Sequence, residues 1–214
     1  YSKLKLMNFK PIPNKFEYLN WQEIESIAKE KRSTVIWPFG AVEQHGPHLP
    51  LATDSIFVDD IISEVFKLLP ADIPLKKLPT QYIGFSPEHK GFAGTISLSS
   101  NLITSMIKEV GGQLSEMGFK RLILINGHGG QISLLNTAAR ELRSFSPGMA
   151  VFPCFLWSGV NGLSELLTKT EIEDGLHASL AETSLMLALK PELVGDERPN
   201  EGNKVEIPEG WSLE

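Results

Sequence analysis

The chain has 214 residues, of which 42% are hydrophobic and 21% are charged, and its formal net charge is −6. This is ordinary globular composition, and an acidic balance without a basic cluster argues against a nucleic-acid partner. No apolar run approaches the roughly 18 residues of a membrane span, and a single cysteine, Cys154, allows no internal disulfide. We therefore expect one cytoplasmic domain over residues 1–214, with residues 1–19 as an N-terminal arm and no membrane partner.

Helical and strand-like patterns alternate along the chain, which predicts a mostly parallel sheet covered by helices. In chain order, the expected elements are a helix after Asn20, a strand at 34–39, a helix at 55–69, a short strand at 75–78, a helix from 99 to 117, a strand at 122–125, a helix over 132–142, an apolar run at 151–156 and a short helix between 177 and 189. The strand at 122–125 is continuously aliphatic, which is typical of a strand buried on both faces. Cys154 is expected in the core, because free cysteine is usually buried.

The stretch after the strand at 34–39 brings together three candidate metal ligands. Glu43 and His45 are two positions apart, and in extended backbone such side chains point to the same side. Asp54 lies beyond a turn and can return as a third ligand. Carboxylate with imidazole suits zinc, manganese or iron better than calcium or magnesium. Taken alone, the stretch has an alternative interpretation as a solvated loop that merely contains charged residues.

Two glycine-rich loops add polar side chains. His128 lies in N-G-H-G-G-Q at 126–131, after an expected strand, and open α/β sheets bind ligands at that edge. The turn is not a dinucleotide fingerprint, because G-x-G-x-x-G from Gly127 would need a glycine where Ile132 stands; a phosphate at the start of the next helix stays an alternative. Ser86 lies in the other loop, where G-F-S-P-E does not match the G-x-S-x-G of a nucleophile elbow.

Three motifs in this order resemble the signatures of the creatininase family of amidohydrolases. They are G-A-V-E-Q-H-G-P-H-L-P-L-A-T-D at 40–54, N-G-H-G-G-Q at 126–131 and H-A-S-L-A-E-T-S at 177–184, and the loop G-F-S-P-E-H-K-G-F-A-G-T at 84–95 is also similar. The resemblance implies the α/β class, as a three-layer α/β/α sandwich with a mostly parallel central sheet. It also implies hydrolysis of a C–N bond in an amide or cyclic amide by a hydroxide that bridges two divalent metal ions, Zn, Mn or Fe.

Carried over by position, the resemblance implies five metal ligands: Glu43, His45, Asp54, His128 and Glu182. Asp54 would bridge the two ions, with His45 and His128 on one ion and Glu43 on the other. Creatinine-hydrolysing members place a carboxylate two residues after the equivalent of His128, where this chain has Gly130. This departure argues against creatinine as the substrate, and it makes Glu182 the expected fifth ligand.

Further roles follow from the same resemblance. His177 is expected, with Glu182, to be catalytic and to protonate the departing nitrogen, because its ordinary pKa near 6.5 suits an acid; orienting a metal ligand is its alternative role. Ser86, Gly129 and Gly130 are expected to contact the substrate, where backbone N–H groups help to hold the oxyanion. His48 and His89 are expected to be rim or structural residues.

The resemblance also implies a homo-oligomer, a trimer or a hexamer, and a small-molecule amide as substrate. Relatives with the same G-G turn act on formamides of cofactor pathways or trim a peptide, so a formamide hydrolase or a peptidase is an alternative on the same site. A non-catalytic small-molecule-binding α/β protein is the alternative from another class, against which the complete ligand set argues. Because Pro199–Glu214 is polar and family members usually continue further, we expect the native C-terminus to extend beyond this sequence.

Overall fold

The chain folds around one parallel sheet. The computed structural model describes residues 14–70, 72–175 and 177–199, and within them four strands pair in the order β2-β1-β3-β4. The strands are β1 (Thr34–Phe39), β2 (Leu75–Lys77), β3 (Arg121–Asn126) and β4 (Ala150–Phe155). Phe39 is level with Asn126, which is level with Phe155 on the next strand. Three strands therefore end at one edge of the sheet, and the loops that follow them meet there.

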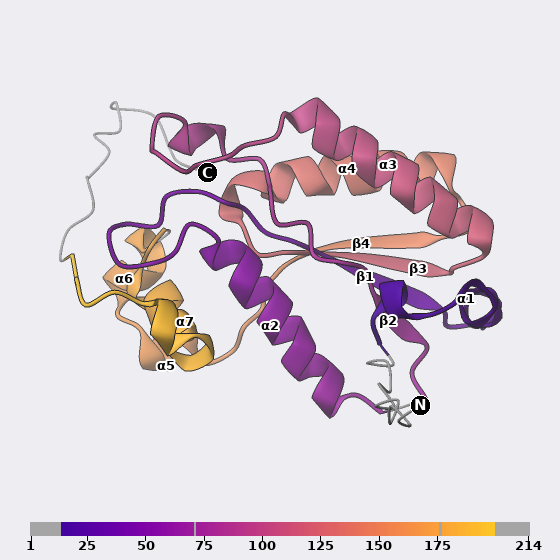
Figure 1. Ribbon diagram of the computed structural model, residues 1–214, viewed down its shortest axis with the longest axis horizontal. Helices are drawn as coiled ribbons and strands as arrows, with labels where there is room; N and C mark the ends of the chain where they lie inside the picture. Colours follow the sequence, from indigo (N-terminus) through magenta and orange to yellow (C-terminus); the bar gives the residue numbers. More distant parts are fainter. Residues whose placement is uncertain (1–13, 71, 176, 200–214) are drawn as a thin grey trace, which may run out of the picture.

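Helices cover both faces of this sheet. The α-helices are α1 (Trp21–Ala28), α2 (Thr53–Leu68), α3 (Ser100–Met117), α4 (Ile132–Phe145), α5 (Leu163–Leu166), α6 (Lys169–Asp174) and α7 (Leu180–Leu189). Short 3-10 helices lie at Phe16–Tyr18, Pro87–His89, Gly129–Gln131 and Pro191–Leu193. Figure 1 shows α3 and α4 above the sheet and α2 below it, and α7 packs against α2. This arrangement confirms the predicted three-layer α/β/α sandwich with a parallel sheet.

Alternate side chains of β1 divide the core into two parts. Val35, Trp37 and Phe39 pack toward α3 and α4, whereas Ile36 packs with Ile62 of α2. All six residues of β1 are buried, and each buried apolar side chain of this size stabilises the fold by about 1.5–3 kcal/mol. The loop that leaves β1 therefore starts from the most firmly packed strand of the described sheet.

Sequence signals set helix ends where they were predicted. The Glu23 amide donates to Asn20 Oδ1 at 3.1 Å, and the Asn20 amide donates to Glu23 Oε2 at 2.8 Å, which completes the capping box of α1. Gly118 ends α3 with a φ of 105°, a left-handed conformation that glycine adopts without strain. α2 begins at Thr53 rather than at 55, so Asp54 lies in its first turn, where the helix dipole favours a carboxylate.

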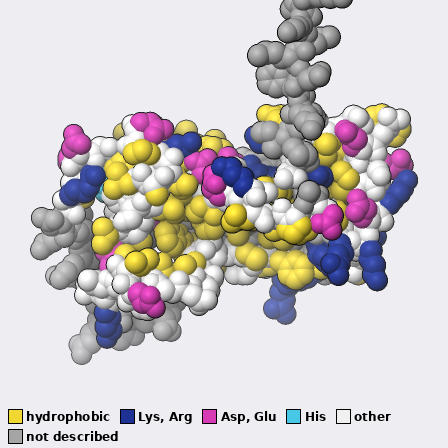
Figure 2. Space-filling view, turned by 90° about the horizontal axis from the view of Figure 1, so that it is seen from below, with side chains coloured by type: hydrophobic (Ala, Val, Ile, Leu, Met, Phe, Trp, Pro, Cys, Tyr) yellow, Lys and Arg dark blue, Asp and Glu magenta, His cyan; other side chains and the backbone are white. Residues whose placement is uncertain are grey.

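Two burial predictions for β3 and β4 are wrong. Ile123 and Ile125 of β3 are only half-buried, and Cys154 of β4 is exposed rather than in the core. The reason is that α2 covers β1, while β4 is an edge strand of the described sheet. Phe152, which is level with Ile123, is 47% exposed on the same face. Figure 2 shows hydrophobic side chains gathered around a hollow in the surface seen from below.

Parts of two predictions lie outside the described residues. Of the arm expected over residues 1–19, only 14–19 are described, and there the Phe16 ring lies 6.0 Å from the ring of Phe119. The polar C-terminal stretch falls outside from residue 200 onward. Among the described helices, none combines the length and apolar character needed to cross a membrane.

Candidate metal centre

The candidate ligands come from four segments at the carboxyl edge of the sheet. Glu43 and His45 lie in the loop after β1, Asp54 in the first turn of α2, His128 after β3 and Glu182 in the first turn of α7. All five side chains are buried.

A glycine lets two of these segments approach each other. A Cβ on Gly40 would lie 2.4 Å from Cα and 2.5 Å from N of Ser55, so only glycine allows the loop to leave β1 so close to α2. The Ser55 hydroxyl then donates to the Ala41 carbonyl at 3.0 Å. This contact fixes the start of the loop that carries Glu43 and His45.

Asp54 lies between two imidazole rings. Its Oδ1 is 3.2 Å from His45 Nε2, and its Oδ2 is 3.2 Å from His128 Nδ1. The outer ring nitrogens face carbonyl oxygens that can only accept, those of Glu43 at 3.1 Å and Phe85 at 3.0 Å. The inner nitrogens of neutral rings therefore present lone pairs toward carboxylates, an arrangement that calls for cations between them.

Among the described residues, four groups of side chains could hold a metal ion; two of them contain His177 or His89 with Glu43, and the other two share Asp54. One set is Glu43, Asp54 and His128, and the other is His45, Asp54 and Glu182; within each set the atoms lie within 4.8 Å of one another. The expected grouping placed His45 and His128 on one ion, whereas neither of these two sets contains both rings. The two rings face different oxygens of Asp54, so each belongs with a different second carboxylate.

Several buried oxygens of this cluster have no hydrogen-bond partner among the described residues. They are both carboxylate oxygens of Glu43, which is 0% exposed, Oδ2 of Asp54 and Oε2 of Glu182. Burying an ionised carboxylate without compensation is costly, by several kcal/mol after relaxation. A divalent cation in each set would satisfy these oxygens, so the residues present fit two metal ions.

The pKa values in the cluster are shifted because several carboxylates are buried together with few positive charges. Burial lowers the pKa of His45, but the hydrogen bond and charge of Asp54 outweigh it and raise the pKa to about 9. For His128, burial is likewise outweighed by the nearby carboxylates of Asp54, Glu43 and Glu88, and the pKa rises to about 12. Burial raises the pKa of Glu182 to about 7. In the absence of a metal, protons on the rings thus compensate the carboxylates.

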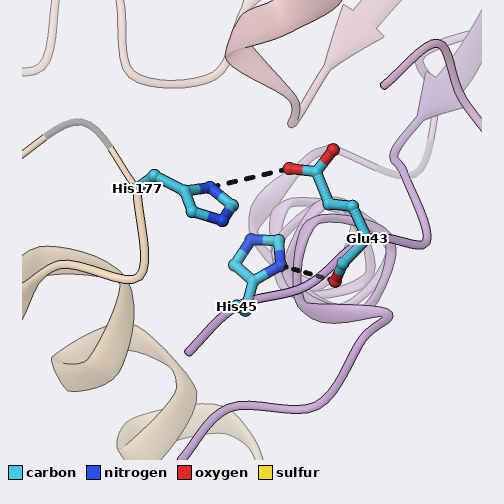
Figure 3. Close-up of side chains that lie close together, drawn as sticks. All are labelled: Glu43, His45 and His177. Carbon is cyan, nitrogen blue, oxygen red and sulfur yellow. Dashed lines mark hydrogen bonds and ion pairs between the residues drawn. The ribbon is translucent and has the colours of Figure 1, made fainter. Parts of the chain in front are cut away.

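His177 lies at the edge of this cluster, as Figure 3 shows. Its Nε2 donates to the Gln44 carbonyl at 2.6 Å, so Nδ1 carries the lone pair, 3.6 Å from Glu43 Oε1. Its ring centroid is 4.3 Å from that of His45. Burial, and then the positive charge of His45, lower the pKa of His177 to about 4. His177 is therefore a neutral base that faces the cluster.

His89 is closer to the cluster than the sequence indicated. Its Nε2 lies 3.6 Å from Glu43 Oε1, its ring stacks on that of His177 at 4.3 Å, and its side chain is 15% exposed. The sequence feature that could have indicated this position is that His89 lies in the loop at 84–95, three residues after Ser86. We therefore add His89 to the residues that face the candidate ligands.

The residues expected to contact substrate surround His128. Ser86 is fully buried with its Oγ 3.4 Å from His128 Nε2, while Gly129 and Gly130 are exposed in the turn that follows. Their contact with a substrate stays a prediction. His48 is buried and bonded to Thr183, which fits a structural role rather than a place on the rim.

Asn126 and Gln131 hold the backbone of His128 in place, and sequence analysis did not single them out. Asn126 accepts from the His128 amide at 3.0 Å and donates to its carbonyl at 2.8 Å. Gln131 donates to Asn126 at 3.0 Å and to the Gly40 carbonyl at 3.1 Å. These bonds tie the loop after β3 to the loop after β1.

The fold and the cluster define an α/β protein with a buried set of side chains that could hold metal ions. A family model described as creatininase, creatinine amidohydrolase, matches residues 17–212. The chain belongs to the creatininase family.

Individual relatives differ in the reaction that their names give. The chain is 33% identical over 181 residues to a "Mycofactocin precursor peptide peptidase" of Mycobacterium tuberculosis. The aligned region covers 82% of this chain and 66% of that relative. It is 28% identical over 194 residues to a "Creatinine amidohydrolase" of Pseudomonas putida, with 84% of this chain and 73% of that protein covered. A solved structure described as "Creatininase Mn" is similar with a TM-score of 0.72 and 25% identity, over 91% of this chain and 81% of that one. The chain thus spans just under two thirds of the peptidase's length.

Proposed function

We propose that this chain is a metal-dependent hydrolase that cleaves a C–N bond of an amide with two divalent cations. The observation that carries the proposal is the position of Asp54, whose two oxygens face two different ligand sets. Glu43, Asp54 and His128 would hold one cation, and His45, Asp54 and Glu182 the other. Nitrogen with carboxylate ligands favours zinc, manganese or iron.

When bound, a pair of divalent cations supplies a nucleophile from water near neutral pH and polarises the amide carbonyl. Asp54, which belongs to both sets, would hold the two cations in place relative to each other. Backbone N–H groups of the exposed Gly129–Gly130 turn are candidates to hold the oxyanion that develops on the substrate.

His177 would transfer the proton that the reaction needs. Because its pKa is lowered to about 4, the ring is neutral near pH 7 and can accept a proton at Nδ1. The attacking water loses this proton, and the departing nitrogen must gain one. The Gln44 carbonyl holds the other ring nitrogen at 2.6 Å and so keeps Nδ1 turned toward the cluster.

The substrate class is an amide, either of a small molecule or of a peptide. The 33% identity to a precursor peptide peptidase, against 28% to a creatinine amidohydrolase, supports a peptide as the second candidate. Gly130, where creatinine-hydrolysing members are expected to carry a carboxylate, supports a substrate other than creatinine.

A substrate panel on metal-loaded protein tests the proposal. We would incubate the protein with creatinine, N-formyl amines, lactams and short peptides, and measure newly released amine. Wild type should release amine from at least one class, and Asp54→Asn should release none. A protein that binds compounds of the panel without cleaving any would instead be a non-catalytic binding protein.

A further inference from the structure

Glu88, to which the sequence analysis gave no role, faces the outer side of His128. Its Oε1 lies 3.3 Å from His128 Nε2, the ring nitrogen opposite the one that faces the candidate ligands. Two other oxygens lie near the same nitrogen, the Phe85 carbonyl at 3.0 Å and Ser86 Oγ at 3.4 Å. A carboxylate on the outer nitrogen of a metal-binding histidine fixes the ring and raises its basicity.

Gly130 leaves the space in which this carboxylate sits. A Cβ on residue 130 would lie 2.0 Å from Glu88 Oε1 and 2.6 Å from His128 Nε2. Gly130 is not among the described glycines with positive φ, so its backbone does not require glycine. Next to it, a Cβ on Gly129 would meet nothing within 4 Å. Position 130 is therefore restricted by the Glu88 carboxylate and the His128 ring.

We propose that Glu88 is a positioning residue for the metal centre, which holds the His128 ring through Nε2, and that position 130 is glycine because this carboxylate and the ring occupy its side-chain space. The inference rests on the metal centre proposed above. The side-chain space of position 130, where the resemblance leads one to seek a ligand carboxylate, is occupied by a carboxylate that reaches in from another loop. Glu88 also offers a ligand atom within 4.8 Å of those of Glu43 and His89. We assign it to the outer side of His128 because its Oε1 lies 3.3 Å from Nε2 of that ring.

The expected effect is moderate. Oε1 of Glu88 is near enough, at 3.3 Å from His128 Nε2, to hold the ring. However, the Glu88 side chain is 42% exposed and the Phe85 carbonyl remains on the same nitrogen, and exposed charges are screened by solvent. Loss of such outer partners typically weakens metal binding about 10- to 100-fold, and we expect the lower end.

Chelator competition for manganese on the full chain measures the effect directly. Glu88→Ala should weaken one of the two ions about tenfold. Glu88→Gln, which keeps an accepting oxygen but loses the charge, should recover part of this loss. Lys90→Ala, at an exposed position of the same loop, should bind both ions as wild type does. With Co²⁺ as the probe, the visible absorption of one ion should shift in Glu88→Ala.

Substitutions at the two glycines test the spatial half of the proposal. Gly130→Ala should weaken the same ion, and its effect should be smaller in a Glu88→Ala background, where only the His128 ring is displaced. Gly129→Ala should leave the manganese affinity unchanged, because a Cβ there meets nothing within 4 Å. If the losses of metal affinity in Gly130→Ala and Glu88→Ala simply add in the double variant, the two side chains do not compete for the same space.

The outcomes separate this inference from the metal centre itself. A wild type that binds no metal overturns both. If the wild type, Glu88→Ala and Glu88→Gln all bind two ions with equal affinity, only the role of Glu88 is overturned. Complete loss of one ion in Glu88→Gln would make Glu88 a ligand and contradict its action through His128.

Discussion

Nε2 of His48 lies 2.8 Å from Oγ1 of Thr183, and both side chains are buried. This hydrogen bond joins the loop after β1 to α7, at the residue next to Glu182. The loop is also held by a bond from the Gly195 amide to the His48 carbonyl at 2.7 Å. His48 thus links two of the three segments that supply the set of His45, Asp54 and Glu182, namely those of His45 and Glu182.

Removing this link should loosen one metal site. Thr183→Val keeps the shape of the side chain but leaves His48 Nε2 without its partner, which we expect to cost about 1–3 kcal/mol of stability. The ion held with Glu182 should bind several-fold more weakly. Thr34→Val is a matched control, because it removes a 2.8 Å bond from Thr34 Oγ1 to the Arg32 carbonyl at the far end of β1. Unchanged metal affinity in Thr183→Val would contradict the link.

Glu182→Gln should weaken one ion and leave the other in place. A neutral amide oxygen is a poorer donor to a dication than a carboxylate, and the other set does not contain Glu182. Elemental analysis after dialysis should give about one ion per chain instead of two. Two ions with full turnover would show that Glu182 is not a ligand.

His177→Asn should separate proton transfer from metal binding. The variant should lose about 10²- to 10⁴-fold in kcat, the usual contribution of a general acid–base, and retain both ions. The metal content, measured on the same sample, is its internal control. If the ions are lost with the activity, His177 acts by orienting a ligand instead.

The stability of the metal-free protein should fall as pH rises. The folded pKa of His45 is about 9 against an ordinary value of 6.5, so its stabilising contribution is complete below 6.5 and is lost as pH rises through about 9. The lowered pKa of His177 changes the stability only below pH 6.5, so it does not oppose this trend. Thermal unfolding in chelator should show Tm decreasing over this window. Because bound metal displaces the ring protons, the decrease should be absent in metal-loaded protein; a flat profile in chelator would contradict the account.

Much of the fold was predictable from local signals. The Asn20 capping box, the apolar run at Thr34–Phe39 and the glycine after α3 are short-range features, and the structure places their elements as expected. The exposure of Cys154 was not predictable, because it depends on which strand α2 covers. Apolar composition does not reveal whether a strand lies at the edge of a sheet.

The candidate ligands followed from motifs, but their grouping did not. Two-residue spacing indicated that Glu43 and His45 converge, and together with His177 they form one candidate metal group. The spacing did not indicate that the Glu43 carbonyl holds the outer nitrogen of His45, which turns the ring toward Asp54 Oδ1. The approach of Glu88 to His128 joins positions 40 residues apart. Only the packing of their loops brings these side chains together.

The most direct test of the account is the manganese content and electron paramagnetic resonance of the reconstituted protein. We predict two ions per chain with a spin-coupled spectrum, because a carboxylate shared between the two ligand sets places the ions next to each other. In Asp54→Asn, the coupling should be lost together with at least one ion. A single ion per wild-type chain, or two ions whose spectrum is uncoupled and unchanged in Asp54→Asn, would contradict the proposed centre.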